Sequence, residues 1–374
     1  MKYNICIISV LCLCGCLSGN TANTGMTGTH LYAGRIEPAE DQTPLCSEIN
    51  LDDFEYAPPL KINDLFLPPE KIVLSDGKKE LLSSCRRLKS TREHILLTEF
   101  WSNVVLFDKK GKYLRTICKF NRPDNAVIDS VNGIIYILFH DKQDHCIKKY
   151  GLNGSYLGKI PLKTGEYERD IFAKGLLCDG LDVDEKGNLL IHYAYWDGNK
   201  TPYNYYLYNK EGKLLHSLKS MDKRFFYGSE KAIITEYNSY LFNNLLHVTD
   251  AGGTIFALQN TKFVPKYRFK SRHSLEALLN TEPRKPVCPM VATFVAETPT
   301  LLLFIFRIYQ DKVETFAGYY NKQQNKVYRI KGGSLFSADP VTGVMHLSPN
   351  SGSNGKEFYS VNPMTQELYK LNLK

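Results

Sequence analysis

The sequence of 374 residues predicts an all-β fold, and three observations support this prediction. First, a short unit recurs six times: a few apolar or aromatic residues, a polar turn with Gly, Asn or Gln, and then apolar residues that alternate with polar ones. Second, the turns of these units run from Gly111 to Gln366 with a mean spacing of about 51 residues, slightly longer than the ~40–50 residues of a four-stranded propeller blade. Third, the helical period of 3.6 residues is found in one short stretch at most. Together they predict a six-bladed β-propeller in a single domain.

Each recurring unit is expected to form a β-hairpin. Gly or Asn in the turn adopts a positive φ at little steric cost, and the alternation directs one face of each strand inward. The intervals leave room for two further strands, as in Ile134 to Phe139 and Leu189 to Tyr193. The apolar run Leu301 to Phe306 is far shorter than the ~20 residues of a membrane helix and is expected to be a buried strand. The units lie at residues 106–114, 149–157, 207–215, 256–267, 319–330 and 361–371.

A propeller must also close its ring. The apolar stretch Lys71 to Leu74 precedes the first hairpin, and we expect it to complete the last blade after Leu371, which removes an exposed sheet edge. The alternatives explain less. A β-sandwich does not need a hairpin that recurs at this spacing, and an α/β fold needs more helical runs.

The first residues predict export and attachment to a membrane. Lys2 supplies a positive charge, Ile5 to Leu13 an apolar run, and Leu13-Cys14-Gly15-Cys16 the cleavage site of a bacterial lipoprotein signal, so Cys16 is expected to become the lipidated N-terminus. The Ser, Thr, Gly and Asn residues that follow favour a flexible tether. The predicted organisation is a signal peptide at 1–15, a lipidated N-terminus and tether at 16–60, and the propeller at 61–374.

The composition is that of a globular protein rich in strand-forming aromatic residues, with 24 Tyr and 19 Phe. The formal net charge of +8 is spread over turns such as 108–112 instead of forming a basic stripe, so no nucleic-acid partner is expected. The sequence leaves the oligomeric state open. An exported protein permits one or more disulfides among the cysteines that follow Cys16, which are Cys46, Cys85, Cys118, Cys146, Cys178 and Cys288.

Several segments of the chain match one family. They are the signal that ends at Cys16, the entry segment 60–66, the strand at 72–74, the hairpin at 105–117 and the segment 263–269. On these segments the chain resembles the six-bladed β-propeller lipoproteins of Gram-negative bacteria of the Bacteroides type, over most of residues 60–374. The resemblance implies the propeller fold and an anchored location, but no established reaction. This chain departs from the family at 118–123, where the family often has a Gly-rich stretch ending in Gly-Pro-Gly-Glu-Tyr.

One aromatic group is the predicted ligand-binding site. Tyr193, Tyr195 and Trp196 precede the polar run 197–200, and aromatic rings beside polar groups are the composition of a sugar-stacking site. The alternative is that these rings pack between blades.

Other motifs point to turns. Asp182-x-Asp184-x-Lys186-Gly187 begins like a calcium loop, but Tyr193 stands where the bidentate Glu belongs, so a hairpin turn is the preferred interpretation. Residues 129–131 resemble an acceptor sequence for bacterial O-glycosylation. No linear pattern predicts a catalytic residue, a metal site or a cofactor, although several blades can jointly supply ligands at a propeller axis.

These features favour a non-enzymatic envelope lipoprotein whose propeller acts as a binding or scaffold module for a glycan, a peptide or a protein partner. The alternative is a propeller enzyme with an axial site, either a metal-dependent lactonase-like hydrolase or a polysaccharide lyase. Several Asp, Glu, His or Asn side chains at the axis would favour the enzyme, and an apolar axis would exclude it. The lipid anchor is expected in the outer membrane, and the lack of acidic residues at 17–20 favours its periplasmic leaflet.

Overall fold

In the computed structural model, the chain divides into the units Met1–Gln42 and Thr43–Lys374, and the described residues belong to the second unit. The expected signal peptide, the lipidation site Cys16 and most of the tether lie outside the described residues. The described residues are 46–75, 85–99, 103–119, 123–140, 145–161, 178–193, 195–196, 203–219, 233–234, 239–250, 253–274, 290–309, 313–344, 347, 356–361 and 367–374.

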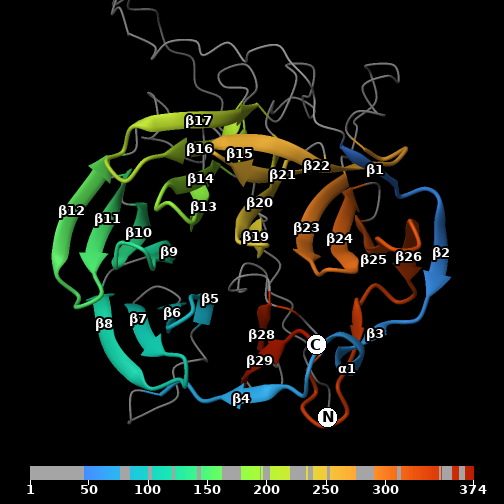
Figure 1. The fold of residues 1–374 in the computed structure, drawn as a ribbon, viewed down its shortest axis with the longest axis horizontal. Helices are drawn as coiled ribbons and strands as arrows, with labels where there is room; N and C mark the ends of the chain where they lie inside the picture. Colours follow the sequence, from blue (N-terminus) through green and yellow to red (C-terminus); the bar gives the residue numbers. More distant parts are fainter. Residues whose placement is uncertain are drawn as a thin grey trace, which may run out of the picture. The chain divides into compact units, whose positions relative to one another are not determined.

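The unit Thr43–Lys374 is a six-bladed β-propeller, as the sequence predicts (Figure 1). Neighbouring strands within a blade are antiparallel, except where two short strands from the start of the unit add in parallel to the outer edge of two blades, and the strands of a blade follow one another from the centre outward. We number the blades I to VI in chain order. Blade I consists of β5 (Cys85–Ser90), β6 (His94–Glu99), β7 (Asn103–Asp108) and β8 (Tyr113–Lys119). Blade II consists of β9 (Pro123–Asp129), β10 (Ile134–His140), β11 (His145–Gly151) and β12 (Tyr156–Pro161). Blade III consists of β13 (Cys178–Val183), β14 (Leu189–Tyr193), β16 (Tyr203–Tyr208) and β17 (Leu214–Lys219).

The remaining blades take strands from both ends of the unit. Blade IV consists of β19 (Ser239–Phe242), β20 (Leu245–Thr249), β21 (Thr254–Gln259), β22 (Lys262–Lys270) and β1 (Ser47–Asn50). Blade V consists of β23 (Met290–Glu297), β24 (Leu301–Tyr309), β25 (Val313–Asn321), β26 (Lys326–Ile330) and β2 (Phe54–Ala57). Blade VI consists of β28 (Glu357–Val361), β29 (Leu368–Asn372) and β4 (Glu70–Ile72). Two short sheets and one helical turn complete the elements: β3 (Leu60–Lys61) with β27 (Phe336–Ser337), β15 (Tyr195–Trp196) with β18 (Ile233–Ile234), and α1 (Ile62–Leu65).

In blades I to V the predicted hairpin joins the third and fourth strands counted from the centre, and in blade VI it joins β28 and β29, which β4 then follows. Five of the expected turn residues have a positive φ, which is the conformation that Gly and Asn adopt most readily. The sixth expected turn, at Gln366, lies outside the described residues. The five are Gly111 (87°), Gly154 (82°), Gly212 (86°), Asn260 (48°) and Asn325 (54°).

The hydrophobic core is divided among the interfaces between neighbouring blades. Six clusters of buried apolar side chains each join two adjacent blades. A strand inside a blade is therefore buried on both faces, which explains its continuous apolar sequence. In β24, Leu302 and Phe304 pack towards blade IV, whereas Leu301 and Leu303 pack towards blade VI. The run at 301–306 is thus a buried strand, as expected.

The ring closes through the two ends of the unit. β4 pairs antiparallel with β29, with Ile72 opposite Leu368 and Glu70 opposite Lys370. The predicted strand at 71–74 therefore does complete the last blade, although it begins one residue earlier and ends at Ile72. Because β4 precedes blade I in the chain, the first and last blades are held together by one continuous segment.

The folded unit begins earlier than the sequence indicates. β1 and β2 run parallel to the outer strands β22 and β26, and the ion pairs Glu48–Lys270 and Glu55–Lys326 are both 2.6 Å long. Residues 47–60, which the sequence assigns to the tether, thus lie along the rim of the propeller. Their strands are short and mostly exposed, so they carry too little apolar alternation to be recognised.

Two further findings concern membrane-spanning helices and disulfides. In the described part of the chain, no helix has the length and apolar character needed to cross a bilayer. Cys46, Cys118 and Cys146 are thiols that take part in no disulfide. The structure does not describe the side chains of Cys85, Cys178 and Cys288.

Candidate functional site

A cavity of 320 Å³ lies at the propeller axis. Residues from all six blades line it, so the cavity is a property of the closed ring and not of any one sheet. One lining residue from each blade, in order, is Lys89, Asp129, Asp182, Ser239, Phe294 and Phe358.

The cavity lies where the inner strands run into their first turns. β5, β9 and β13 are the innermost strands of blades I to III, and the residues that end them line the cavity together with the turns that follow. In β13, Leu181 and Val183 pack into the core shared with blade II. Because side chains alternate along a strand, Asp182 is directed to the opposite face. Asp182 therefore faces blade IV, where Ser239 contacts it beside the cavity.

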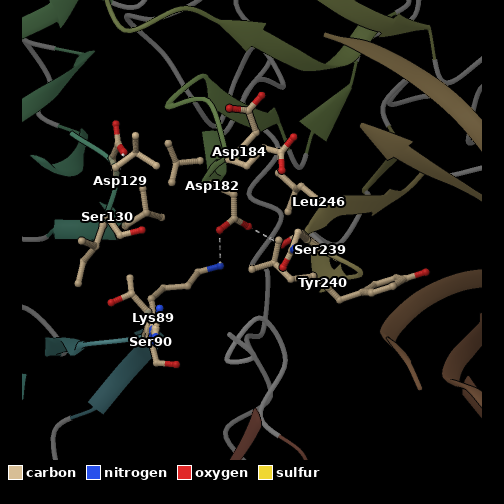
Figure 2. A pocket seen from close by; sticks show the side chains of 18 of the residues that line it. Lys89, Ser90, Asp129, Ser130, Asp182, Asp184, Ser239, Tyr240 and Leu246 are labelled. Carbon is tan, nitrogen blue, oxygen red and sulfur yellow. Dashed lines mark hydrogen bonds and ion pairs between the residues drawn. The ribbon is translucent and has the colours of Figure 1, made fainter. Parts of the chain in front are cut away.

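Three polar side chains from three blades meet in this cavity. Lys89 of blade I extends to Asp182 of blade III, and Ser239 of blade IV contacts the same carboxylate, as Figure 2 shows. Lys89 Nζ lies 2.7 Å from Asp182 Oδ1, and the Ser239 hydroxyl donates to Asp182 Oδ2. The side chains of Lys89 and Asp182 are each 12% exposed. We call these three residues the axial cluster.

Burial changes the acid–base properties of the amine. It lowers the pKa of Lys89 from its ordinary value, and the contact with Asp182 opposes this shift. Two charges that are removed from water in this way depend on each other, since loss of one would take away the opposite charge 2.7 Å from the other. The axial cluster is therefore a fixed arrangement of one donor and one acceptor group in contact with the cavity.

Two further carboxylates beside the cavity hold turns in shape. Asp129 Oδ1 accepts the N–H of Val131 at 3.0 Å. Asp184 Oδ1 accepts the N–H groups of Lys186 at 2.9 Å and Asn188 at 2.8 Å. These bonds fix the connections that follow β9 and β13, and with them the wall of the cavity.

The calcium-like motif is a hairpin turn, which was the preferred interpretation of the sequence. Gly187 has a φ of 78°, and its N–H donates to the Asp184 carbonyl at 3.1 Å. Asp182, the first carboxylate of the motif, is paired with Lys89 instead. Among the residues that the structure describes, no group of three or more His, Cys, Asp or Glu side chains could hold a metal ion.

The mouth of the cavity is polar and exposed. Arg92, Ser130, Glu185 and Asn244 are exposed lining residues contributed by blades I to IV. Val131 is 69% exposed beside them. Ser130 and Val131 belong to the acceptor-like sequence at 129–131, so that sequence lies in an accessible turn. The cavity thus combines a buried ion pair with an open polar entrance.

The predicted ligand-binding residues are not brought to this cavity by the backbone. Tyr193 ends β14, and Tyr195 and Trp196 form β15, but the side chains of all three lie outside the described residues. Tyr193 pairs with Cys178 at the start of β13. Asp182 lies near the other end of that strand, so Tyr193 and the axial cluster belong to opposite ends of blade III.

Sequence reasoning missed the axial cluster because its members are distant in the chain. Lys89, Asp182 and Ser239 share no spacing, and the propeller axis is the only feature that relates them. A weak signal existed in β13, where Asp182 interrupts an apolar strand between Leu181 and Val183. A carboxylate at such a position needs a partner.

A second buried polar cluster joins blades IV and V beside the cavity. Glu297 is 1% exposed, accepts hydrogen bonds from Tyr267 at 2.8 Å and Tyr240 at 3.1 Å, and pairs with Lys322 at 2.6 Å. Burial and the nearby carboxylate raise the pKa of Tyr240 well above its ordinary value. His247 stacks on Tyr240 with ring centroids 4.8 Å apart, and its buried Nε2 has no hydrogen-bond partner among the described residues. Burial lowers the pKa of His247 to about 4.

A closed ring of six blades around an axial cavity defines the chain as a six-bladed β-propeller protein. A family model described as "Domain of unknown function (DUF4934)" matches residues 46–371, so the chain belongs to the DUF4934 family. The match begins one residue before β1, which agrees with the inclusion of 47–60 in the fold. No curated protein matches the sequence.

Solved structures with the same fold include one from Bacteroides. The crystal structure of a "Putative exported protein" from Bacteroides fragilis NCTC 9343 is 13% identical, with a TM-score of 0.57, and the match covers 88% of this chain and 100% of that chain. The β-propeller domain of Cps50 (Swd1) from Myceliophteria thermophila is 8% identical, with a TM-score of 0.41, over 83% of this chain and 99% of that chain. At these identities the likeness concerns the fold alone. The resemblance predicted from the sequence is thus confirmed in two respects: the chain is a six-bladed propeller, and a Bacteroides protein has a similar structure.

Proposed function

We propose that this chain is an exported lipoprotein whose propeller binds a polar ligand, which is a glycan, a peptide or a segment of an envelope protein, in its axial cavity. The observation that carries the proposal is the cavity of 320 Å³ to which all six blades contribute. Ligand sites in proteins combine apolar walls with a few converging polar groups. Here Val127, Leu246 and Phe294 are among the wall residues, and the axial cluster supplies the polar groups.

The N-terminal sequence supports export and anchoring. The charged residue, the apolar run and Leu13-Cys14-Gly15-Cys16 together form a lipoprotein signal, with Cys16 as the acylated residue. The similar Bacteroides structure belongs to a protein described as exported, which agrees with this part of the proposal. The anchor lies in the outer membrane, in its periplasmic leaflet.

The axial cluster supports binding better than nucleophilic catalysis. A nucleophilic serine needs a base whose pKa lies near the working pH. Ser239 instead donates to the Asp182 carboxylate, which also accepts from the Lys89 ammonium. The cluster therefore holds its charges in fixed positions, which suits recognition of a ligand.

A propeller enzyme with an axial site, such as a metal-dependent lactonase-like hydrolase or a polysaccharide lyase, is the second candidate. The lining favours it because it contains Asp129, Asp182 and Asp184, although among the described residues these carboxylates form no group that could hold a metal ion. Elemental analysis of the purified chain separates the two candidates. One equivalent of tightly bound metal would support the enzyme.

A binding screen tests the proposal. The full chain with Cys16→Ser, which prevents acylation, is titrated against a panel of glycans and a panel of peptides. We expect members of one panel to bind and to raise the melting temperature. Mass spectrometry of the wild-type chain should show acylation that Cys16→Ser removes. Absence of binding in both panels would contradict the proposed function.

A further inference from the structure

We infer that the ligand of the axial cavity is a neutral saccharide, and that its terminal sugar ring enters the cavity with one hydroxyl bridging Lys89 and Asp182. This inference rests on the proposed function and narrows its ligand class. Three properties of the cavity carry it: the pairing of a donor with an acceptor, the volume, and the polar mouth.

The first property is the chemistry of the ion pair. Lys89 Nζ and Asp182 Oδ1 are 2.7 Å apart and both residues line the cavity. A hydroxyl that approaches such a pair can accept from the ammonium and donate to the carboxylate, because it carries one donor and two acceptor positions on a single atom. Hydrogen bonds to charged groups are also stronger than those between neutral groups. Sugar hydroxyls therefore match the ion pair closely.

The ion pair also selects against charged ligands. A ligand carboxylate attracted by Lys89 would be repelled by Asp182 at nearly the same distance, and a ligand amine would meet the reverse arrangement. In a site of low exposure neither repulsion is screened well by water or salt. A neutral ligand with many hydroxyls avoids both penalties.

The second property is the volume. A cavity of 320 Å³ lies at the small end of the ~300–1,000 Å³ range of ligand pockets, which limits the buried part of the ligand to about one sugar ring. The rest of a longer glycan must leave through the mouth. There Thr91, Ser130 and Asn244 offer neutral polar groups beside the exposed side chains of Arg92 and Glu185. The glycan is therefore bound by its end and not along its length.

The test uses the full chain with Cys16→Ser and three sets of probes: neutral oligosaccharides, oligosaccharides that contain uronic acids, and peptides. The axial variant is Lys89→Met with Asp182→Leu, which replaces both charges of the ion pair at once. The matched control is Lys326→Met with Glu55→Leu, the same pair of replacements at a rim ion pair of 2.6 Å. A third variant, Ser239→Ala, keeps both charges and removes only the hydroxyl that contacts Asp182. Circular dichroism and thermal unfolding establish that each variant is folded.

We expect neutral oligosaccharides to bind, the axial variant to weaken binding by about 10- to 100-fold, and the rim control to stay within about twofold of the parent. Ser239→Ala should weaken binding severalfold. If only peptides or acidic saccharides bind, and the axial variant weakens that binding, the inference is wrong and the proposed function stands. If saccharides bind equally well to the axial variant and to Ser239→Ala, the axial site itself is wrong, and the inference and the proposed function fall together. If no probe of any set binds, both are wrong.

Discussion

The charges at the propeller axis hold each other in place. Lys89 and Asp182 are each 12% exposed, and Ser239, which is 3% exposed, also contacts Asp182. A buried ion pair gains Coulomb energy that the loss of hydration roughly offsets, so its net contribution to stability is small. Removal of only one of the two residues is different, because the other charge then loses its ion pair while it stays buried. The pair thus specifies the arrangement of the axis more than it stabilises the fold.

This asymmetry gives the first prediction. Lys89→Met should lower the free energy of unfolding by about 3–5 kcal/mol, because it removes the ammonium that pairs with the buried Asp182 carboxylate. Adding Asp182→Leu should restore most of the loss. Urea unfolding followed by circular dichroism measures both variants. A double variant that is as unstable as Lys89→Met alone would show that the pair itself stabilises the fold.

A buried histidine gives the second prediction, which concerns pH. The pKa of His247 is lowered from 6.5 to about 4, mainly by burial, although Glu297 acts in the opposite direction. The folded state therefore binds fewer protons than the unfolded state between these values, so stability falls as the pH drops from 6.5 towards 4. The full contribution is roughly 3 kcal/mol.

His247→Phe provides the comparison for this pH effect. The variant keeps an aromatic ring beside Tyr240 and cannot titrate. The unfolding free energy of the parent chain should therefore decrease more steeply between pH 6.5 and 4 than that of the variant. Equal pH dependence in the two chains would mean that His247 is not the group responsible.

At the scale of elements, the recurring hairpin does more than reverse the chain. In blades I and V its turn carries a lysine that reaches back to the first turn of the same blade: Lys109 Nζ donates to the Thr91 carbonyl at 2.9 Å, and Lys322 Nζ donates to the Thr298 carbonyl at 2.6 Å. Each lysine also pairs with a glutamate at the interface with the preceding blade. The same hairpin thus closes its own blade and locks it to a neighbour.

The third prediction concerns the turn glycine of the first hairpin. Gly111 has a φ of 87°, and a Cβ at this position would lie 2.4 Å from the Val73 carbonyl oxygen. Gly332 has a φ of 89° and no atom within 4 Å of its Cβ position. Gly332→Ala should lower the free energy of unfolding by only the ~1–2 kcal/mol of the unfavourable backbone conformation. Gly111→Ala should lower it by clearly more, because the Val73 backbone must also move. Chemical denaturation of the two variants measures this difference, and equal losses would contradict the close contact.

Which elements could be predicted from the sequence depends on how local their signal is. The hairpin turns at Gly111 and Asn325 are encoded by a few adjacent residues, and the buried run of β24 by its own composition. β1 and β2 were missed because each has only four residues and takes its stability from another strand. The axial cluster was missed because it also depends on partners far apart in the chain: its three residues meet only when the ring is closed.

At the scale of the whole molecule, closure of the ring sets how the six blades are arranged around the axis. The axial cavity exists because six blades face one centre, and blade VI is completed by β4, which lies almost 300 residues before β29 in the chain. The rim strands β1 and β2 add to blades IV and V on the way to β4. The segment that precedes blade I thus pairs with strands of three consecutive blades. A substitution in this segment should therefore alter the arrangement of the blades around the axis.

The fourth prediction tests this closure with two adjacent residues. Ile72 is 5% exposed and belongs to the cluster between blades VI and I, whereas Val73 is 47% exposed. Ile72→Ala should lower the free energy of unfolding by about 2–5 kcal/mol, as expected for a large-to-small change in a core. Val73→Ala should change it by at most about 0.5 kcal/mol. Because β4 forms the outer edge of blade VI, Ile72→Ala should also speed amide hydrogen exchange in β29 and β6 before the other blades respond. Exchange that rises equally in blades II and III would mean that the propeller opens as one cooperative unit and that closure at β4 has no special weight.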